Sequence, residues 1–231
     1  MLLNHARSKV LDSQAPVSID NGLTGLTTEE YHRRELKIAL DPTHPEHVLP
    51  PAVPRSAKVL DIGCGGGQTL IAAYPDRLTY GIDLDEDALR LGQSLTDRIC
   101  FVRGDGESLP FAGNSFDMVL ARVSLPYMRI GPTIREMRRV LRPGGEIWIT
   151  LHIFRSVWRQ ACESSVKGWI FFVYIVLNSM LLHLAQKEFS FFGRNESFQT
   201  ERGIRRLLER NGFDDIRISV GEHFIVSAHA R

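Results

Sequence analysis

Cysteine is scarce in this sequence, and its first residues lack the composition of a signal peptide. The 231 residues include three cysteines, Cys64, Cys100 and Cys162, at unrelated spacings. An odd number of cysteines without a paired pattern predicts neither a disulfide framework nor a zinc site, so we expect no bound metal. Residues 1–12 have no apolar core of the kind that a secretory signal needs. We therefore expect a cytoplasmic protein in a reducing compartment.

An excess of charge of either sign is also absent. The 28 lysines and arginines balance 27 acidic residues, which leaves a net charge of +1. This balance provides no overall attraction to nucleic acid or to an anionic membrane. One basic run, Arg135, Arg138, Arg139 and Arg142, falls on a predicted helix and is typical of a solvated face. We therefore expect no nucleic-acid partner.

Internal repeats and low-complexity tracts are absent as well, and the length suits one domain with extra elements. Five prolines lie between residues 41 and 54. They are too many for a helix or a central strand, so this segment is predicted to be a stiff connector. It joins an N-terminal part, residues 1–56, to a domain over residues 57–231. The N-terminal part holds an irregular arm and a helix that Thr27 and Glu30 are predicted to cap.

From Lys58 onward, predicted strands alternate with predicted helices. This alternation is typical of an α/β fold with a doubly wound, mostly parallel sheet. Strands are expected near 58–62, 78–82, 99–103, 116–121 and 146–151, and helices near 67–74, 86–95 and 132–141. A last helix at 203–210, capped by Thr200, precedes two more predicted strands at 216–220 and 224–228.

A glycine-rich turn follows the first predicted strand, where Asp61 is succeeded by Gly63, Gly65 and Gly67. Such a turn at the carboxyl end of a parallel strand is typical of a nucleotide site. A phosphate-binding loop would need a following Gly-Lys-Ser/Thr, which is absent, and a dinucleotide fingerprint would need glycine where Gln68 stands. The remaining candidate is S-adenosylmethionine (SAM), whose sites open with an acidic residue and then G-x-G-x-G.

Further motifs occur in order after this turn, beginning with a second strand that ends at Asp83. They continue with Gly104-Asp105-Gly106, then residues 114–120, and then residues 140–146. In these motifs the chain resembles class I SAM-dependent methyltransferases, and it is similar to the small-molecule methyltransferases related to quinone-biosynthesis C-methylases. The resemblance covers residues 58–150 and, more weakly, 196 to the end. It implies seven strands in the order 3-2-1-4-5-7-6, with the last strand antiparallel.

The resemblance also implies how SAM, and its product S-adenosylhomocysteine, would be bound. The carboxylate of Asp83 would accept hydrogen bonds from the ribose hydroxyls. Leu84 would pack on the adenine, Asp105 would take its amino group, and Gly106 would offer a backbone N–H. Near the methionyl and ribose groups we expect Asp61, Gly63, Cys64, Gly65 and Gly67.

Catalytic side chains are harder to identify, because an activated methyl group needs mainly positioning and desolvation. His152 follows the fifth predicted strand and is the first candidate base by position, ahead of His183 and His223. Arg122 ends the fourth strand and could touch cofactor or acceptor. Many small-molecule relatives carry a histidine where Pro126-Tyr127 stands here. The acceptor pocket is predicted to include Ser124, Tyr127 and, from the N-terminal helix, Tyr31.

The insertion over residues 154–192 departs most from the minimal fold. Residues 169–177 are apolar on every helical face. The run is borderline in length for a membrane span, and a single crossing would separate the last strands from their sheet. We expect a helical cap over the strand ends, with Trp169 and Phe172 lining an acceptor pocket. The alternatives are a helix pair that fills the core or a dimer interface, and a contact with a membrane surface. Monomer and homodimer both remain open.

Three functions follow from these patterns. The first is an enzyme that moves a methyl group from SAM to a small, hydrophobic organic molecule by in-line displacement. The second is an RNA or protein methyltransferase, although the sequence shows no basic groove. An Asn/Asp-Pro-Pro-aromatic motif, typical of enzymes that methylate amino groups of DNA bases or glutamine, is also absent. The third is a SAM-binding module without chemistry.

Overall fold

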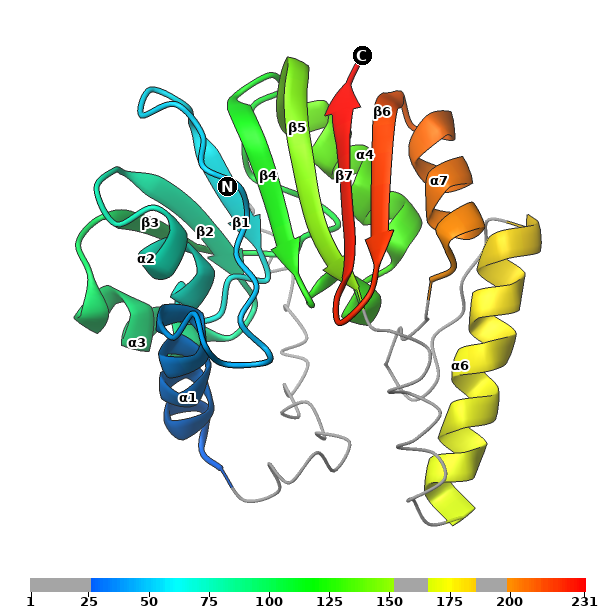
Figure 1. Cartoon of the computed structure of the whole chain (residues 1–231), viewed down its shortest axis with the longest axis horizontal. Coiled ribbons are helices and arrows are strands. Elements are labelled where there is room, and N and C mark those ends of the chain that lie inside the picture. The colour runs from blue at the N-terminus through cyan, green and yellow to red at the C-terminus, as the bar shows by residue number, and fades with distance from the viewer. Residues whose placement is uncertain (1–25, 152–165, 186–198) are drawn as a thin grey trace, which may run out of the picture.

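A seven-stranded sheet forms the centre of the molecule, with the strand order β3-β2-β1-β4-β5-β7-β6 (Figure 1). The computed structural model describes residues 26–151, 166–185 and 199–231. Neighbouring strands from β3 to β5 pair in parallel, whereas β7 is antiparallel to both β5 and β6. The predicted order is therefore confirmed. The strands are β1 (Val59–Ile62), β2 (Thr79–Asp83), β3 (Ile99–Arg103), β4 (Phe116–Arg122), β5 (Leu141–Leu151), β6 (Phe213–Val220) and β7 (Phe224–Ala230).

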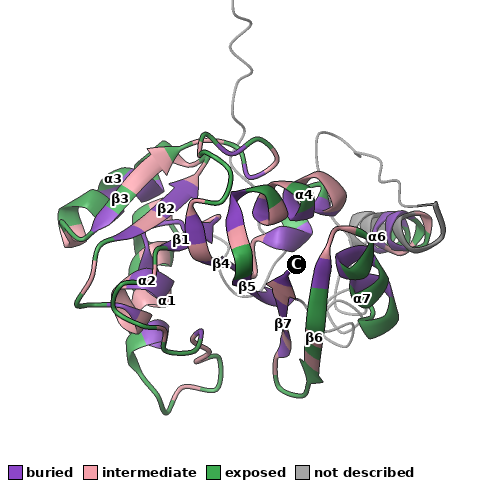
Figure 2. Cartoon of the chain, turned by 90° about the horizontal axis from the view of Figure 1, so that it is seen from above, coloured by how far each residue is buried: buried purple, intermediate pink, exposed green. Residues whose placement is uncertain are grey.

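Helices cover both faces of this sheet (Figure 2). One face packs against α4 and α7 around the largest apolar cluster, and the other packs against α2 and the proline-rich connector. Helix α1 contacts α2 and α3. The bounds are α1 (Thr28–Leu40), α2 (Gln68–Ala73), α3 (Glu86–Leu95), the 3-10 helix η1 (Leu125–Tyr127), α4 (Ile130–Val140), α6 (Val166–Ala185) and α7 (Glu201–Arg210).

The local signals for helix starts are confirmed by hydrogen bonds. The Thr27 hydroxyl accepts from the Glu30 N–H at 3.2 Å, and the Glu30 carboxylate accepts from the Thr27 N–H at 2.8 Å. Together they form the predicted capping box, which satisfies donors that a helix start leaves free. At the start of α7, the Thr200 hydroxyl accepts from the Gly203 N–H at 3.1 Å.

Two strands begin earlier than expected. β5 starts at Leu141 rather than near 146, and its register against β4 shifts between the partners Phe116 and Met118. The Pro143-Gly144-Gly145 turn therefore lies inside an irregular strand rather than before it. β6 starts at Phe213, and Asp215, at φ 45°, sits where its register against β7 shifts. Extra residues in an antiparallel pair are accommodated in this way by a local bulge.

Helix α6 stands beside α7, at the opposite end of the sheet from α1 (Figures 1 and 2). Phe172, Tyr174 and Ile175 are buried on one face of it. The large side chains left exposed are Trp169, Ile170, Val173, Leu177 and Met180. Within the described ranges, no helix combines the length and the apolar character that a membrane crossing needs.

Candidate functional site

The glycine turn follows β1 and lies against β2. The N–H groups of Gly63 and Cys64 both donate to the Ile82 carbonyl, at 2.8 and 3.1 Å. Gly63 has φ 70° and Gly65 has φ 52°, in the region that favours glycine. A Cβ on Gly63 would lie 2.3 Å from the Ser124 Cβ. The turn thus needs glycine both for its backbone conformation and for close packing.

Asp83 ends β2 next to this turn. One of its carboxylate oxygens accepts from the Gly65 N–H at 2.7 Å, and the other accepts from the Asp85 N–H at 2.9 Å. The backbone carbonyl of Asp83 accepts from the Gly104 N–H at 3.0 Å, which ties the loop after β3 to the same place. Leu84, the next residue, is 62% exposed. A carboxylate and an accessible apolar side chain therefore lie together at this strand end.

The loop after β3 carries Asp105 and Gly106. Asp105 is exposed, and its side chain accepts from the Glu107 N–H at 2.9 Å. Gly106 is buried, and a Cβ there would lie 2.7 Å from the Ile62 side chain and 2.8 Å from the Met128 sulfur. This packing holds the Gly106 backbone against the carboxyl end of β1. The structure thus brings Asp105 and Gly106 to the edge of the sheet that carries the glycine turn.

Asp61 is the buried acid of the site, with only 1% of its surface exposed. No described group forms a hydrogen bond with its Oδ1 atom. Burial raises the pKa of Asp61 to about 7, although the nearby Arg122 acts in the opposite direction. Burial also raises the pKa of the Cys64 thiol, so Cys64 packs as an apolar side chain and is no nucleophile. An unpaired buried carboxylate oxygen is costly and suits a cationic partner.

Arg122 and Glu35 form a mostly buried ion pair at the end of β4. The Arg122 Nη1 lies 3.3 Å from the Glu35 Oε2, and the two side chains are 13% and 16% exposed. The Nε of Arg122 is buried and has no hydrogen-bond partner among the described residues. Glu35 was not predicted from the sequence. Its position one turn after Tyr31 on the N-terminal helix was the available signal.

Helix α1 lies directly on the glycine turn. A Cβ on Gly65 would come within 2.5 Å of the His32 ring, and the His32 Nδ1 lies 2.5 Å from the Gln68 Nε2. Burial lowers the pKa of His32, while Asp83 and Asp85 oppose the shift. The Tyr31 ring packs edge-on against His32, at 5.0 Å between centroids. Tyr31 itself is 39% exposed at this end of the sheet.

The turn after β4 has a strained backbone. Val123 has φ 58°, which is unfavourable for a β-branched residue. Its N–H donates to the carbonyl and to the hydroxyl of Thr150, at 3.2 and 3.0 Å. The Ser124 hydroxyl donates to the Ile62 carbonyl at 2.5 Å, so this side chain joins β1 to β4. Tyr127 is 53% exposed on η1.

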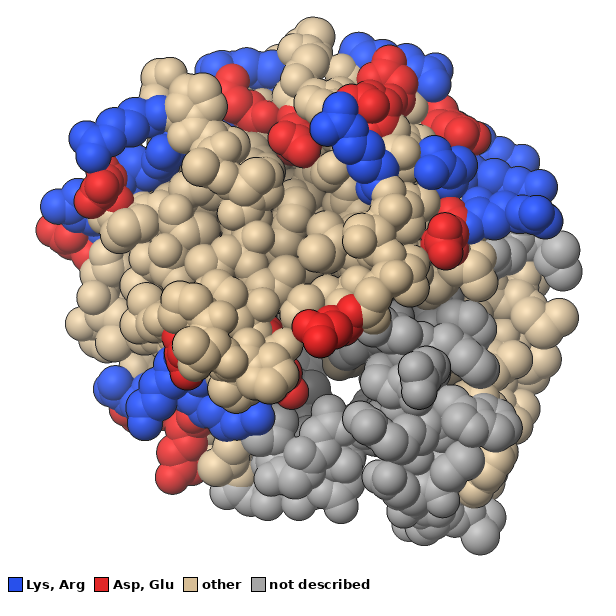
Figure 3. Space-filling view, viewed as in Figure 1, with Lys and Arg blue, Asp and Glu red and all other residues tan. Residues whose placement is uncertain are grey.

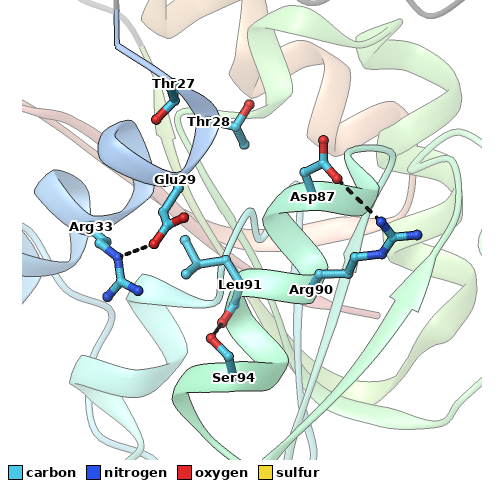
Figure 4. Close-up of a pocket in the computed structure, with 8 residues that line it drawn as sticks. All are labelled: Thr27, Thr28, Glu29, Arg33, Asp87, Arg90, Leu91 and Ser94. Atoms are coloured by element: carbon cyan, nitrogen blue, oxygen red, sulfur yellow. Dashed lines mark hydrogen bonds and ion pairs between the residues drawn. The ribbon is translucent and has the colours of Figure 1, made fainter.

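The groove drawn in Figure 4 is separate from these residues. It lies between α1 and α3, and its charged groups already pair with acids of their own helix. Arg33 lies 2.7 Å from Glu29, and Arg90 lies 3.7 Å from Asp87. No residue predicted for the cofactor lines it, so this groove is not the cofactor site.

The remaining predicted site residues lie either away from the glycine turn or outside the described residues. His152 is outside the described residues, and so are the segments on either side of α6. Trp169 is exposed and Phe172 is buried on α6, on the other side of the sheet from α1 (Figure 1). Because the segments that join α6 to the sheet lie outside the described residues, the expected cap over the strand ends stays a prediction, as does a pocket role for either residue. Among the described residues, no cluster of His, Cys, Asp or Glu could hold a metal ion.

The residues at the strand ends fit SAM by their chemistry. The unpaired Oδ1 of Asp61 suits an ammonium group, and the unpaired Nε of Arg122 suits a carboxylate. Together they match the two charges of a methionyl group. Asp83 offers carboxylate oxygens for ribose hydroxyls, while Leu84 and the loop at Asp105 offer apolar and polar surface for adenine.

Comparisons with known proteins point in the same direction. A family model described as "Methyltransferase domain" matches residues 60–149. The chain is 27% identical over 184 residues to a demethylmenaquinone methyltransferase of Staphylococcus aureus, covering 72% of this chain and 71% of that protein.

Solved structures share the fold. One is a SAM-dependent methyltransferase of Methanosarcina mazei, at 20% identity and a TM-score of 0.53, covering 77% of this chain and 94% of that one. Another is phosphoethanolamine N-methyltransferase 2 of Haemonchus contortus in complex with SAM, at 19% identity and a TM-score of 0.52. That match covers 73% of this chain and 35% of the other.

Proposed function

The chain is a class I SAM-dependent methyltransferase, and we propose that its acceptor is a small, hydrophobic organic molecule. The observation that carries the cofactor assignment is the glycine turn between the carboxylates of Asp61 and Asp83, with Arg122 beside it. Support for the acceptor class comes from the similarity to demethylmenaquinone methyltransferase. That relative is named for a prenylated quinone, which is both small and hydrophobic.

The protein's own groups bind and orient in this proposal. SAM supplies a methyl group that its sulfonium already activates. Asp61 and Arg122 hold the two charges of the methionyl end, and Asp83 holds the ribose. Helix α1 covers these groups through His32 and Glu35 and excludes water. Exclusion of water and alignment of the acceptor supply most of the acceleration that such a transfer needs.

A general base is not required by every acceptor. It is needed only where the attacking atom starts protonated with a high pKa. Tyr31 and Tyr127 are the partly exposed phenols near the strand ends, and we assign them to the acceptor side of the site. We assign Ser124 a structural role instead of one in the acceptor pocket, because its hydroxyl already donates to the Ile62 carbonyl. His152 stays a candidate base on sequence grounds alone.

The test is methyl transfer from labelled SAM into a cell extract that is separated by size. We expect label in the small, solvent-extractable fraction, and then in a prenylated hydroquinone offered as a pure acceptor. Label that stays with RNA or protein would replace the proposal with a macromolecular substrate. Binding of SAM without label in any fraction would indicate a module that lacks chemistry.

A further inference from the structure

The exposed apolar side of α6 is a feature that the proposed reaction does not use. We propose that this side, together with the arginines of α7, docks on a membrane surface that carries anionic lipids. The apolar stripe consists of Trp169, Ile170, Val173, Leu177 and Met180. The inference goes beyond the methyl-transfer reaction and does not depend on which acceptor is used.

The stripe runs the length of the described part of the helix. Trp169, Val173, Leu177 and Met180 follow at intervals of four, four and three residues, so they share one face. They are 41%, 50%, 53% and 53% exposed. A contiguous apolar patch of this kind is among the larger ones that a soluble monomer exposes, and such patches are often interaction sites.

Two polar residues of α6, Asn178 and Ser179, lie on the other side of the helix. Asn178 is 0% and Ser179 is 2% exposed. The Asn178 amide donates to the Tyr174 hydroxyl at 3.4 Å, and the Ser179 hydroxyl donates to the Ile175 carbonyl at 2.6 Å. An ordinary surface helix turns its polar side to water and its apolar side inward. In α6 the inward side is apolar too, at Phe172, Tyr174 and Ile175, and the exposed side shows only apolar side chains among the residues described. Such an exposed side suits an apolar environment outside the protein.

Positive charge lies on α7, the helix next to α6 (Figures 1 and 2). Arg202, Arg205, Arg206 and Arg210 are all exposed there, and Figure 3 shows basic side chains gathered above the uncharged surface of α6. Glu201 and Glu209 are the acidic residues of the same helix. No described carboxylate forms an ion pair with any of the four arginines. Arg205 also donates to the Ile216 carbonyl at 3.1 Å. Apolar side chains near cations that no described carboxylate neutralises are the combination that binds an interface rich in anionic lipid.

A second copy of the chain fits the same surface less well. An aromatic side chain has roughly 150–250 Å² of surface, and an aliphatic one has less. The five described side chains of the stripe are about half exposed and therefore offer about 500 Å² or less, below the roughly 800 Å² per partner of a standard interface. A symmetric dimer over this surface would also bring the arginine-rich α7 helices of the two subunits into the same interface, where their like charges would repel. Lipid headgroups supply the opposite charge instead.

Flotation with lipid vesicles tests the proposal on the full chain. We expect the protein to float with vesicles of phosphatidylcholine and phosphatidylglycerol, and much less with phosphatidylcholine alone. The double variant V173Q/L177Q should bind at least about tenfold more weakly, because it removes two apolar side chains from the interface. L78Q is the matched control, since Leu78 is 58% exposed outside the stripe. R202Q/R206Q should lower the dependence on phosphatidylglycerol.

Two further measurements distinguish a loss of membrane binding from misfolding and from a loss of the methyl-transfer site. SAM affinity, measured by calorimetry, should be the same for the wild type and all of these variants. Brominated lipids should quench wild-type tryptophan fluorescence and quench W169F less. Equal binding by V173Q/L177Q and L78Q, or no binding of the wild type to anionic vesicles, would overturn the proposal. A wild-type dimer that V173Q/L177Q turns into a monomer would assign the stripe to a second copy instead.

Discussion

At the scale of single residues, the protonation state of Asp61 affects folding and the proposed cofactor binding in opposite ways. Its folded pKa of about 7 lies above the ordinary value of 3.8. The proton that burial favours stabilises the folded protein below about pH 4, and this stabilisation is lost as the pH rises to about 7. In the proposed site, the ammonium group of the cofactor would require the opposite state, the ionised carboxylate. Binding and folding would then prefer different protonation states of one side chain.

The first prediction concerns the pH dependence of SAM binding. Because Asp61 must lose its proton to meet the ammonium group, the affinity should fall by about tenfold per pH unit below pH 7 and level off above it. Isothermal titration across this range measures the slope. D61N cannot ionise and should bind weakly with no such slope. A wild-type affinity that does not change with pH would exclude the assigned role.

The second prediction concerns Asp83. Each charge-assisted hydrogen bond contributes about 1.5–3 kcal/mol, so losing two in Asp83→Ala should weaken SAM binding by about a hundredfold or more. Asp83→Asn, which keeps one acceptor oxygen, should lose less. Asp87→Asn is the control, since that carboxylate is 77% exposed on α3. Calorimetry that gives equal affinities for Asp83→Ala and the control would remove Asp83 from the ribose site.

Asp61 and Asp83 could be predicted for the site from the sequence because their positions follow from local patterns. A buried strand that breaks into glycine fixes Asp61, and the end of the next strand fixes Asp83. The strained backbone of Val123 could not be predicted in that way. A β-branched residue avoids positive φ in isolation, and here two hydrogen bonds from its N–H to Thr150 on a neighbouring strand help to hold it.

At the scale of elements, α1 joins the site through contacts from a helix that precedes the sheet. Glu35 reaches Arg122, which lies 87 positions later in the chain, and His32 reaches Gln68 and the glycine turn. The sequence predicted this helix and its cap but not Glu35. The capping box is local, whereas the partner of Glu35 depends on how the helix docks.

The third prediction compares the contribution of the mostly buried Glu35–Arg122 ion pair with that of the exposed Glu29–Arg33 pair. Glu35→Gln removes the carboxylate that pairs with Arg122 in a mostly buried place, which should weaken the docking of α1 by about 1–3 kcal/mol. Amide exchange in residues 28–40 and the dissociation of SAM should both become faster. Glu29→Gln is the matched control on the same helix, because the exposed Glu29–Arg33 pair contributes about 0.5 kcal/mol or less. Equal exchange rates for both variants would show that Glu35 does not hold the helix.

At the scale of the whole molecule, the strand that is last in the sequence, β7, lies inside the sheet between β5 and β6. It pairs with β5 over Glu146–Leu151 and with β6 on its other side. The burial alternates along β7, as expected for a strand with two different faces. This order could be predicted because the resemblance to a family supplied it. The early starts of β5 and β6 could not, because bulges form between strands and leave no clear local signal.

The fourth prediction tests whether β6 and β7 fold with the rest of the sheet. Phe213 is fully buried at the start of β6, so Phe213→Ala should lower the free energy of unfolding by about 3–5 kcal/mol. Val220→Ala, at a residue of the same strand that is 49% exposed, should change it by about 0.5 kcal/mol or less. Urea denaturation followed by circular dichroism gives both values. A second transition confined to Phe213→Ala would mean that this end unfolds separately.

Because β7 follows all the other strands in the sequence, the sheet cannot be completed until β7 has been synthesised. While the ribosome is still adding residues 213–223, β5 has β4 on one side and no neighbour on the other, because its second partner has not been made. Its open edge and the apolar residues around Ile147 and Ile149 are then exposed to other nascent chains, and unpaired edges of this kind promote aggregation. Synthesis itself is therefore the period in which this protein most needs a chaperone, and slowing translation before β7 should lower its yield.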